Sequence, residues 1–571
     1  MWKIEGIPAS AGIAIGQIMH IEESVSDFSR VVDPSEISKE KERFLAAQQV
    51  AETELDALQE RTALTVGEHQ AEVFAAHKLM VQDPSLVDAV FEEIQTNCAS
   101  AEAAVETAAE AIASMFASMD NEYMRERAAD IKDIAKRLVR ILQGKVDDVQ
   151  YTGILVAQDL LPSDTACIDF DCVSGFITAL GGKTSHSSIL ARAAGLAAVV
   201  GVGNVIEKLN NGDMVIIDGH VGQVLVNPEE SVLEEYRQRM LAEQARIAAL
   251  AEISHLASVT IDGHHIEVAS NIGTPADMKK VLEAGADGVG LFRTEFLFLD
   301  KTSVPTEEEQ VESYRAVLTA APDKKIVIRT LDAGGDKQLP FIGGLKEENP
   351  ALGLRAIRLC MVYKDIFKTQ LRALLRASVE GNLHIMFPMI ATLDELLDAK
   401  ALLKEVADEL TKEGVPHRAD VPVGIMIEVP SAAVIADILA PEVDFFSIGT
   451  NDLVQYTMAA DRMNEHVAWL SDYFQPPVIR LIANVAKAAQ EHGKWVGMCG
   501  EMAGDSLATP LLVGLGLTEL SMNARSVPMV KNLVRKLTVE QAKEWAKQVL
   551  ILRTTAEIKG KLEEINKSFE L

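Results

Sequence analysis

The chain has 571 residues, several times the ~150 of a common domain, which predicts two to four domains. Its 85 acidic and 54 basic residues give a formal net charge of −31, which argues against a nucleic-acid or anionic-membrane partner. The N-terminus carries a charge too early for a secretory signal, and no uncharged apolar run reaches the ~18 residues that span a bilayer. Five scattered cysteines, an odd number, favour a reducing compartment over a disulfide framework. We therefore expect a cytoplasmic protein.

The first 144 residues combine strand-like segments with a long helical stretch. Residues 1–30 predict strands interrupted by glycines. The run Asp33-Pro34-Ser35-Glu36 then places a capping residue before a proline and an acidic residue, which indicates a helix start. Residues 31–144 thus predict a helical bundle that either only packs or presents a docking face to a partner, and its His69 and His77 are interpreted as structural or surface residues. The further helices of the bundle are expected at about 68–80, 84–95, 101–119 and 123–142.

Residues 145–228 return to alternating strands and helices. Strands are expected at 153–157, 175–179 and 197–202, followed by a hairpin over 214–226. Together with residues 1–30 this segment predicts one α/β domain, into which the bundle is inserted. Residues 229–258 hold a charged helix without a strong core face, which we interpret as a connector that lets the two halves of the chain move.

The segment Gly181-Gly182-Lys183-Thr184-Ser185-His186-Ser187-Ser188 lies between a predicted strand and a predicted helix. The glycines permit a tight turn, Thr184 or Ser185 can cap the helix, and the free amides of a first helical turn favour an anion. His186 is therefore either a nucleophile whose phosphorylated form is held by those amides, or a solvent-facing histidine in an ordinary turn. This segment alone favours neither interpretation.

Residues 259–571 alternate short strand-like runs with helical stretches. Eight such repeats match a (β/α)₈ barrel, a fold that places its chemistry at the carboxyl ends of the strands. The expected strands are 265–271, 288–294, 325–332, 384–389, 423–429, 444–452, 494–501 and 518–522.

Reactive side chains follow several of these strands. Arginine matches phosphate and carboxylate oxygens with two donors, and two carboxylates are a usual protein contribution to a Mg²⁺ site. The alternative is a buried ion-pair network between the carboxylates and Arg293 or Arg329, which the number of suitable residues makes less favoured. The residues in question are Arg293, Arg329, Glu428, Asn451, Asp452, Arg462 and Cys499.

Cys499 lies between two glycines, Gly497 and Gly500, at the end of the seventh strand. A thiol with an ordinary pKa near ~8.5 is protonated at neutral pH and can donate a proton. The barrel is thus predicted to bind a small phosphorylated and carboxylated substrate with Mg²⁺, while another domain carries a nucleophilic histidine. No Walker A sequence is present, so a nucleotide is not the obvious phosphoryl source.

Two long segments carry a resemblance to a known family. The histidine segment 181–192 and the segment 444–462, which reads DFFSIGTNDLVQYTMAADR, resemble the two signatures of the phosphoenolpyruvate-utilising enzymes. The order of segments, the inserted bundle and the length are similar to the Enzyme I group of the bacterial sugar phosphotransferase system. The resemblance spans essentially the whole chain.

The resemblance implies a phosphoryl transfer from phosphoenolpyruvate to His186 and then to a histidine of the carrier protein HPr. It implies that residues 31–144 bind HPr and that the barrel, residues 259–571, binds phosphoenolpyruvate and forms a homodimer. In the site, Glu428 and Asp452 would bind Mg²⁺, Cys499 would protonate the enolpyruvate carbon, and Thr165 would support His186. The residues implied to bind phosphoenolpyruvate are Arg293, Arg329, Arg355, Lys337, Asn451, Asp452 and Arg462.

One departure from the family pattern is Lys183, where many relatives have arginine; we expect a modest effect. A pyruvate phosphate dikinase or phosphoenolpyruvate synthase is disfavoured because it needs an additional ATP-binding domain. The nitrogen-regulatory form of Enzyme I would carry an extra N-terminal sensory domain. A non-catalytic relative of the same fold would be expected to lack some strand-end residues, all of which are present.

Overall fold

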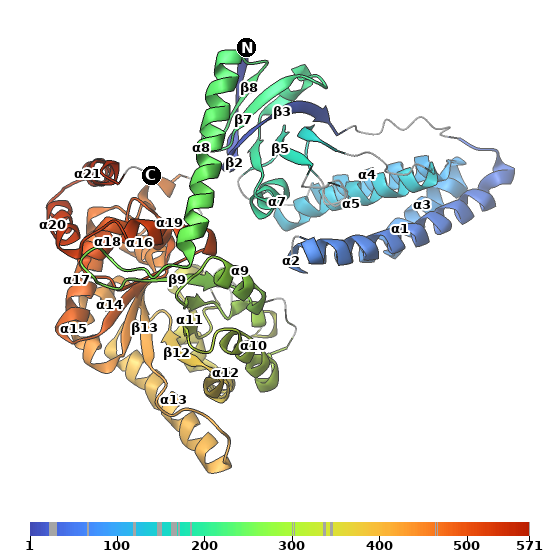
Figure 1. Cartoon of the computed structure of the whole chain (residues 1–571). Coiled ribbons are helices and arrows are strands. Elements are labelled where there is room, and N and C mark those ends of the chain that lie inside the picture. The colour runs from blue at the N-terminus through green and yellow to red at the C-terminus, as the bar shows by residue number, and fades with distance from the viewer. Residues whose placement is uncertain are drawn as a thin grey trace. The chain divides into compact units, whose positions relative to one another are not determined.

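The computed structural model describes the chain except for residues 22–30, 66–67, 118–121, 145–150, 161–167, 169–171, 183–184, 300, 302, 335–338, 343–346, 463, 465 and 570–571. It divides into two compact units, residues 1–244 and 245–571, which are described separately (Figure 1). In the described part of the chain, no helix has the length and apolar content that a membrane crossing requires.

The first unit contains an eight-stranded mixed sheet in the order β1-β8-β7-β3-β4-β5-β6-β2. The predicted hairpin is confirmed, since β7 and β8 pair antiparallel. The expected strands of the segment 1–30 are present as β1, β2 and β3 in its described part. The strands are β1 (Trp2–Glu5), β2 (Ile7–Ser10), β3 (Ile13–His20), β4 (Gly153–Ala157), β5 (Val173–Thr178), β6 (Ala197–Val200), β7 (Met214–Asp218) and β8 (Gln223–Val226).

The expected helical bundle follows β3. Asp33 accepts a hydrogen bond from the Ser35 backbone N–H and so caps the short turn that leads into the first helix. The core of the bundle includes the fully buried Phe44 and Ala51. His77 is buried between Asp130 and Asp133, which fits a structural role, whereas the side chain of His69 lies outside the described residues. The helices are α1 (Ile37–Thr65), α2 (Glu68–Val81), α3 (Pro84–Asn97), α4 (Ala101–Ala117) and α5 (Glu122–Leu142).

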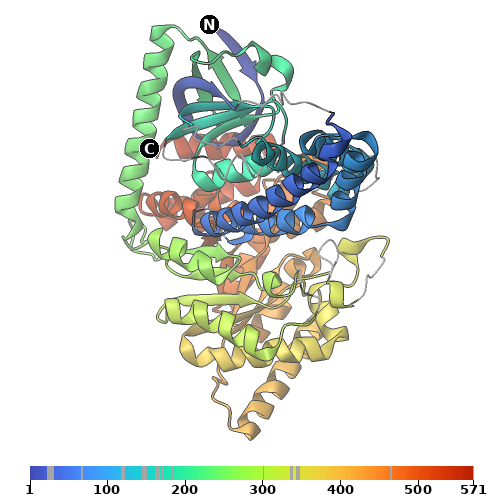
Figure 2. The ribbon, with the colours of Figure 1, turned by 90° about the vertical axis from the view of Figure 1, so that its right-hand side faces the viewer.

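Two further helices follow strands of this sheet. The short α7 (His186–Ala194) follows β5, and the long α8 (Glu230–Ser254) follows β8 (Figure 2). The first turns of α8 bury Leu233 and Tyr236 in one cluster with Ile216 and Leu225 of the sheet. The expectation that this helix lacks a strong core face is therefore wrong for its first turns, where two apolar side chains a turn apart pack on the sheet.

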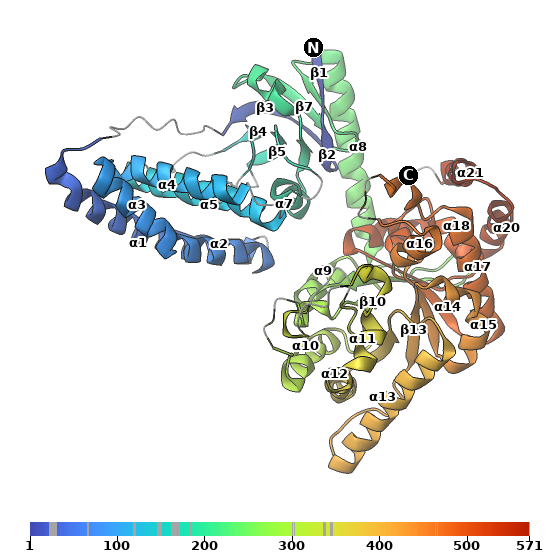
Figure 3. The same ribbon diagram turned by 180° about the vertical axis from the view of Figure 1, so that it is seen from behind.

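The second unit is a closed barrel of eight parallel strands, as the sequence predicted (Figure 3). Seven of the strands are shorter than expected, and the fourth has the expected length but begins two residues earlier. The sixth ends at Ile448, and the residues from Thr450 onward begin a helix rather than continue the strand. The strands are β9 (Glu267–Ile272), β10 (Val289–Phe292), β11 (Lys325–Arg329), β12 (Asn382–Phe387), β13 (Val423–Ile427), β14 (Phe445–Ile448), β15 (Trp495–Met498) and β16 (Glu519–Met522).

Helices surround this barrel, and α13 extends beyond the others (Figure 3). Their apolar faces and the outward-facing strand residues form one large core. The helices are α9 (Met278–Glu283), α10 (Glu307–Ala320), α11 (Ala356–Val362), α12 (Lys364–Ala377), α13 (Leu393–Glu413), α14 (Pro430–Val434), α15 (Ala436–Leu439), α16 (Thr450–Met458), α17 (Pro476–Glu491), α18 (Thr509–Leu515), α19 (Val527–Val534), α20 (Val539–Leu550) and α21 (Thr555–Lys567).

The barrel interior follows from the alternation of side chains along each strand. On β11, Ile326 and Ile328 belong to the outer core, whereas Val327 belongs to a separate inner cluster that also contains Met426 and Cys499. By the same period, the two charged residues of β11, Lys325 and Arg329, lie on the inner face at its opposite ends. The fold therefore places one inward-facing cation of β11 at each end of the barrel.

Candidate active site

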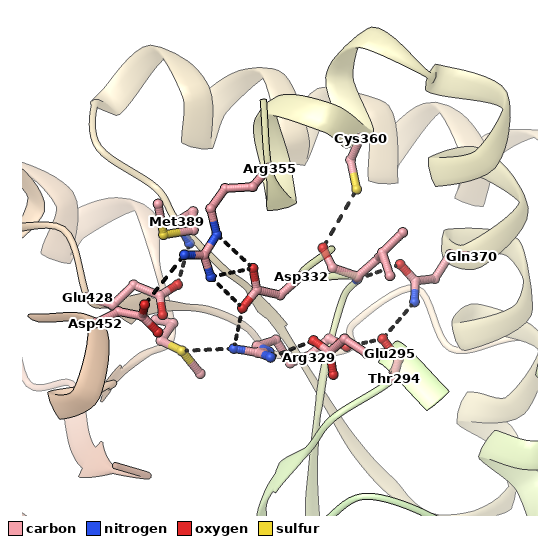
Figure 4. A network of polar contacts seen from close by, with 12 residues as sticks. Thr294, Glu295, Arg329, Asp332, Arg355, Cys360, Gln370, Met389, Glu428 and Asp452 are labelled. Carbon is pink, nitrogen blue, oxygen red and sulfur yellow. Dashed lines mark hydrogen bonds and ion pairs between the residues drawn. The ribbon is translucent and has the colours of Figure 1, made fainter. Parts of the chain in front are cut away.

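Arg329 is the last residue of β11 and lies at the carboxyl end of the barrel, where its side chain is 5% exposed. One nitrogen, Nη2, pairs with Glu295 at 2.5 Å, and Nη1 pairs with Asp332 at 3.0 Å (Figure 4). The Nε–H is buried and finds no acceptor among the described residues. Arg329 thus keeps one unsatisfied donor, which is costly unless a ligand accepts from it.

Arg355 precedes α11 and reaches the same carboxylate. Its Nε and Nη2 donate to Asp332 at 3.3 and 3.0 Å, and its Nη1 lies 3.4 Å from Asp452 (Figure 4). The same Nη1 donates to the Tyr456 hydroxyl at 3.0 Å. Asp332 therefore lies between two guanidinium groups, and Asp452 extends the network toward α16.

Glu428 and Asp452 follow neighbouring strands, Glu428 directly after β13 and Asp452 in the first turn of α16 after β14. Glu428 is 1% exposed and accepts a hydrogen bond from the Met389 backbone N–H at 2.6 Å. Burial, together with the charges of Asp332 and Asp452, raises the pKa of Glu428 to about 8, against the effect of the nearby arginines. A cation bound beside Glu428 would therefore lower this pKa and stabilise the ionised carboxylate.

The charges of this network favour a divalent cation. Two guanidinium groups, Arg329 and Arg355, face the four carboxyl groups of Glu295, Asp332, Glu428 and Asp452, so full ionisation leaves two surplus negative charges (Figure 4). Among the described residues, no group of three or more His, Cys, Asp or Glu side chains could enclose a metal alone. Two carboxylates with open positions suit Mg²⁺, which usually keeps several waters and takes oxygens from a substrate phosphate.

Cys499 lies beside this network at the end of β15 and is 2% exposed. Its backbone N–H donates to the Ile448 carbonyl of the neighbouring strand β14, and its carbonyl accepts from the Asn271 side chain of β9 at 2.9 Å, so two other strands fix its position. Burial raises the pKa of the Cys499 thiol to about 11. Ser447, Arg329 and Arg293 oppose this rise, whereas the charge of Glu428 adds to it. The thiol is therefore protonated at neutral pH and can serve as an acid.

The other predicted barrel residues that the structure describes are less buried. Arg293 and Arg462 are exposed, and neither forms an ion pair within the described residues. Asn451 exchanges hydrogen bonds of 3.2 Å with the side chain and backbone of Glu501. Lys337 and Thr165 lie outside the described residues. The structure thus gathers Arg329, Arg355, Glu428, Asp452 and Cys499 at one end of the barrel.

The alternative of an ion-pair network is correct in part. Carboxylates and arginines do pair here, but Asp452 pairs with Arg355 and not with Arg293 or Arg329. Arg329 instead takes Glu295 and Asp332, two residues that sequence reasoning missed. Glu295 lies two residues after Arg293, and Asp332 lies three residues after Arg329. This closeness in the sequence to a predicted site arginine could have indicated both carboxylates as site residues.

The turn before α7 is held by serine hydroxyls. Ser185 caps the helix by accepting from the Ser188 N–H, which decides between the two expected caps. The hydroxyls of Ser185 and Ser188 donate to the Gly182 carbonyl at 2.9 and 2.7 Å. Gly181 has φ +102, a conformation that favours glycine. His186 is the first residue of α7; its side chain lies outside the described part of the chain.

Comparison with known proteins bears on all of these segments. Models of the PEP-utilising enzymes match the chain as an N-terminal domain at residues 5–127, a mobile domain at 149–222 and a PEP-binding domain at 247–539. The chain belongs to the PEP-utilising enzyme family. The PEP-binding match spans the barrel whose carboxyl end carries the charged network.

Relatives cover nearly the full chain. The phosphoenolpyruvate-protein phosphotransferase of Bacillus sp. (strain S) is 49% identical over 97% of this chain and 96% of the relative. The protein of the same name from Bacillus subtilis is 47% identical over 98% of both. A solved structure titled as the NMR solution structure of Enzyme I is 36% identical over 42% of this chain and 99% of that chain, with a TM-score of 0.37.

Proposed function

We propose that this PEP-utilising enzyme is a phosphoenolpyruvate–protein phosphotransferase. It moves the phosphoryl group of phosphoenolpyruvate to its own His186 and then to a histidine of the carrier HPr, releasing pyruvate. The observation that carries the proposal is the convergence of Arg329, Arg355, Glu428 and Asp452 at the carboxyl end of the barrel. Full-length relatives with this name support it.

The substrate phosphate is assigned to the arginines. Arg329 offers its unpaired buried Nε–H, and Arg355 presents Nη1 at the edge of the network. Arg293 adds an exposed cation. Guanidinium groups suit phosphate because their N–H donors match its oxygens in pairs. We assign the substrate carboxylate to Asn451 and Arg462, with Lys337 as a further phosphate contact.

Glu428 and Asp452 are assigned to Mg²⁺ because they are two carboxylates in a network with surplus negative charge. When bound, the ion neutralises that charge and draws electron density from the phosphate, which favours phosphoryl transfer. Asp452 also lies 3.4 Å from Nη1 of Arg355, so the same carboxylate would hold the ion and contact a substrate-binding arginine.

The chemistry of the first step follows from the nucleophile and the acid. The imidazole nitrogen of His186 forms a bond to phosphorus as the bond between phosphorus and the enol oxygen breaks. The electron pair left on that oxygen forms the carbonyl of pyruvate, while the CH₂ carbon takes a proton from the Cys499 thiol. The thiolate recovers its proton from solvent. Thr165 is assigned to support His186.

The domain roles complete the proposal. Residues 1–30 with 145–228 carry the phosphohistidine, residues 31–144 bind HPr, and residues 229–258 connect them to the barrel. The barrel at residues 259–571 forms a homodimer, and the protein acts in the cytoplasm without nucleic-acid or membrane partners. Because the donor site and His186 lie in different domains, loading and unloading His186 requires the histidine domain to move, which a connecting helix allows.

The proposal is tested with ³²P-labelled phosphoenolpyruvate and Mg²⁺. The chain should take up one acid-labile, base-stable label, lose it to added HPr, and release pyruvate in equal amount. His186→Ala should take up no label, and Glu428→Gln should need more Mg²⁺ for the same uptake. Failure of the parent protein to take up label, or uptake by His186→Ala, would overturn the proposal.

A further inference from the structure

The two phosphate-binding arginines share one buried carboxylate that no substrate role explains. Asp332 lies three residues after Arg329 and is 2% exposed. Its Oδ1 accepts from Nε and Nη2 of Arg355, and its Oδ2 pairs with Nη1 of Arg329 at 3.0 Å (Figure 4). We propose that Asp332 is a positioning residue, which holds both guanidinium groups in the one geometry that receives the substrate phosphate. This inference rests on the proposed function.

Electrostatics explains the need for such a residue. Two guanidinium groups that must reach one phosphate repel each other in the substrate-free site, and the repulsion is strong because both are buried. A carboxylate between them offsets this repulsion before the substrate arrives. Burial opposes the charged form of Arg329, yet Glu295 and Asp332 keep its pKa above the usual range, so the cation persists.

Asp332 leaves part of the hydrogen-bonding capacity of the arginines for the substrate. A guanidinium carries five N–H donors in a planar fork. Asp332 accepts from one nitrogen of Arg329 and from one edge of Arg355, so the Arg329 Nε–H remains without an acceptor among the described residues, while the Arg355 Nη1 contacts the Tyr456 hydroxyl and Asp452. Asp332 itself would repel a phosphate, so it acts through the arginines and not by contact with the substrate.

The backbone around Asp332 is built to hold this arrangement. The Leu331 N–H donates to the Gln370 side chain at 2.9 Å, and the Ala356 N–H donates to the Ala333 carbonyl at 2.9 Å. Gly334 has φ +102, and a side chain there would meet the Leu354 carbonyl at 2.4 Å. The segments that carry Asp332 and Arg355 are therefore in direct contact, and the close approach requires glycine at 334.

The test compares Asp332→Asn with Glu519→Gln as a matched control. Glu519 is a 1% exposed carboxylate that pairs with Lys325 at the opposite end of the same barrel. Asp332→Asn keeps the size of the side chain but loses the charge and one acceptor. We expect the KM for phosphoenolpyruvate to rise by about tenfold or more and kcat to fall by a smaller factor. The variant weakens binding of the phosphate more than it slows the chemical step.

The control separates positioning from stability. Glu519→Gln should lower the thermal midpoint without moving this KM, and Asp332→Glu, which keeps the charge but displaces the carboxylate, should raise KM to an intermediate extent. Asp332→Glu also serves if Asp332→Asn fails to fold. Folded Asp332 variants with the parent KM would overturn the inference, as would an equal rise of KM in Glu519→Gln. The parent protein reports on the proposed function separately: if it takes up no label from phosphoenolpyruvate, that function fails first.

Discussion

Both ends of the barrel hold an ion-pair network, but the carboxyl-end network leaves the buried Nε–H of Arg329 without an acceptor among the described residues. At the amino end, Lys325 pairs with Glu267 at 2.6 Å and with Glu519 at 2.5 Å, and its Nζ lies 3.7 Å from the centre of the Trp495 ring. That ring stacks on Phe445. The cation is thus surrounded by two carboxylates and an aromatic face.

At the carboxyl end the balance differs. Arg329 retains a buried N–H without an acceptor, and the exposed Arg293 has no carboxylate partner among the described residues. A protonated thiol, Cys499, lies beside them. A buried ion-pair network by itself is weak support for a functional site, because the amino end of the same barrel also holds one. Unused donors, reachable cations and an acid group distinguish the carboxyl end.

The largest expected effect concerns the acid. Cys499→Ala should lower the rate of pyruvate formation by about 100-fold or more, because a general acid typically contributes that much, while phosphoenolpyruvate binding changes little. Pre-steady-state pyruvate release and a separate binding titration measure the two quantities. Cys360→Ala is the matched control, since Cys360 is equally buried in the barrel but belongs to its outer core. An equal loss of the pyruvate-formation rate in the two variants would contradict an acid role that is specific to Cys499.

The second prediction concerns stability at the amino end. Lys325→Met leaves Glu267 and Glu519 without their cation, and breaking a buried pair in this way costs about 3–5 kcal/mol of unfolding free energy at pH 8. Burial raises the pKa of Glu519 to about 7, so the carboxyl is protonated at pH 5 and the cost should shrink there. Denaturant unfolding, followed by tryptophan fluorescence, checks both values. A cost that is equal at the two pH values would contradict this explanation.

The third and smallest effect concerns His384, which lies near Phe445 and Trp495 at the same end. Burial, and then the charge of Lys325, lower the pKa of His384 to about 4 from its usual 6.5. The unfolded chain therefore binds the proton first, and stability falls as pH decreases from 6.5 toward 4, by at most about 3 kcal/mol. His384→Gln should flatten this part of the pH profile, and an unchanged slope would exclude His384 as its source.

The sequence predicted the barrel because each strand is a short apolar run and because eight such runs alternate with helices. It also predicted which residues stand at strand ends, including Arg329, Glu428 and Cys499. It did not predict that Asp332 joins Arg329 to Arg355, since that contact depends on how a loop folds back over 20 residues of chain. The inward direction of Lys325 and Arg329 was available from their spacing of four along β11, which alternation places on one face.

The partners of Glu428 show the same limit. Its position after β13 follows from the strand pattern, but its pKa of about 8 arises from burial and from carboxylates on two other segments. Likewise, Ser185 and Thr184 were equally good caps by residue type, and the φ and ψ of the turn select Ser185. Local pattern predicts where a residue lies, whereas charge and hydrogen bonding depend on segments that meet only in the folded chain.

The most direct measurement is the exchange of ¹⁴C between pyruvate and phosphoenolpyruvate in the presence of Mg²⁺ and the absence of HPr. This exchange requires the first step to run in both directions at one site. Arg329→Met and Lys325→Met alter the two ends of the same strand, β11. We predict that Arg329→Met abolishes the exchange and that folded Lys325→Met retains it. Exchange that persists in Arg329→Met, or that is lost equally in both variants, would contradict a phosphoryl-transfer site at the carboxyl end of the barrel.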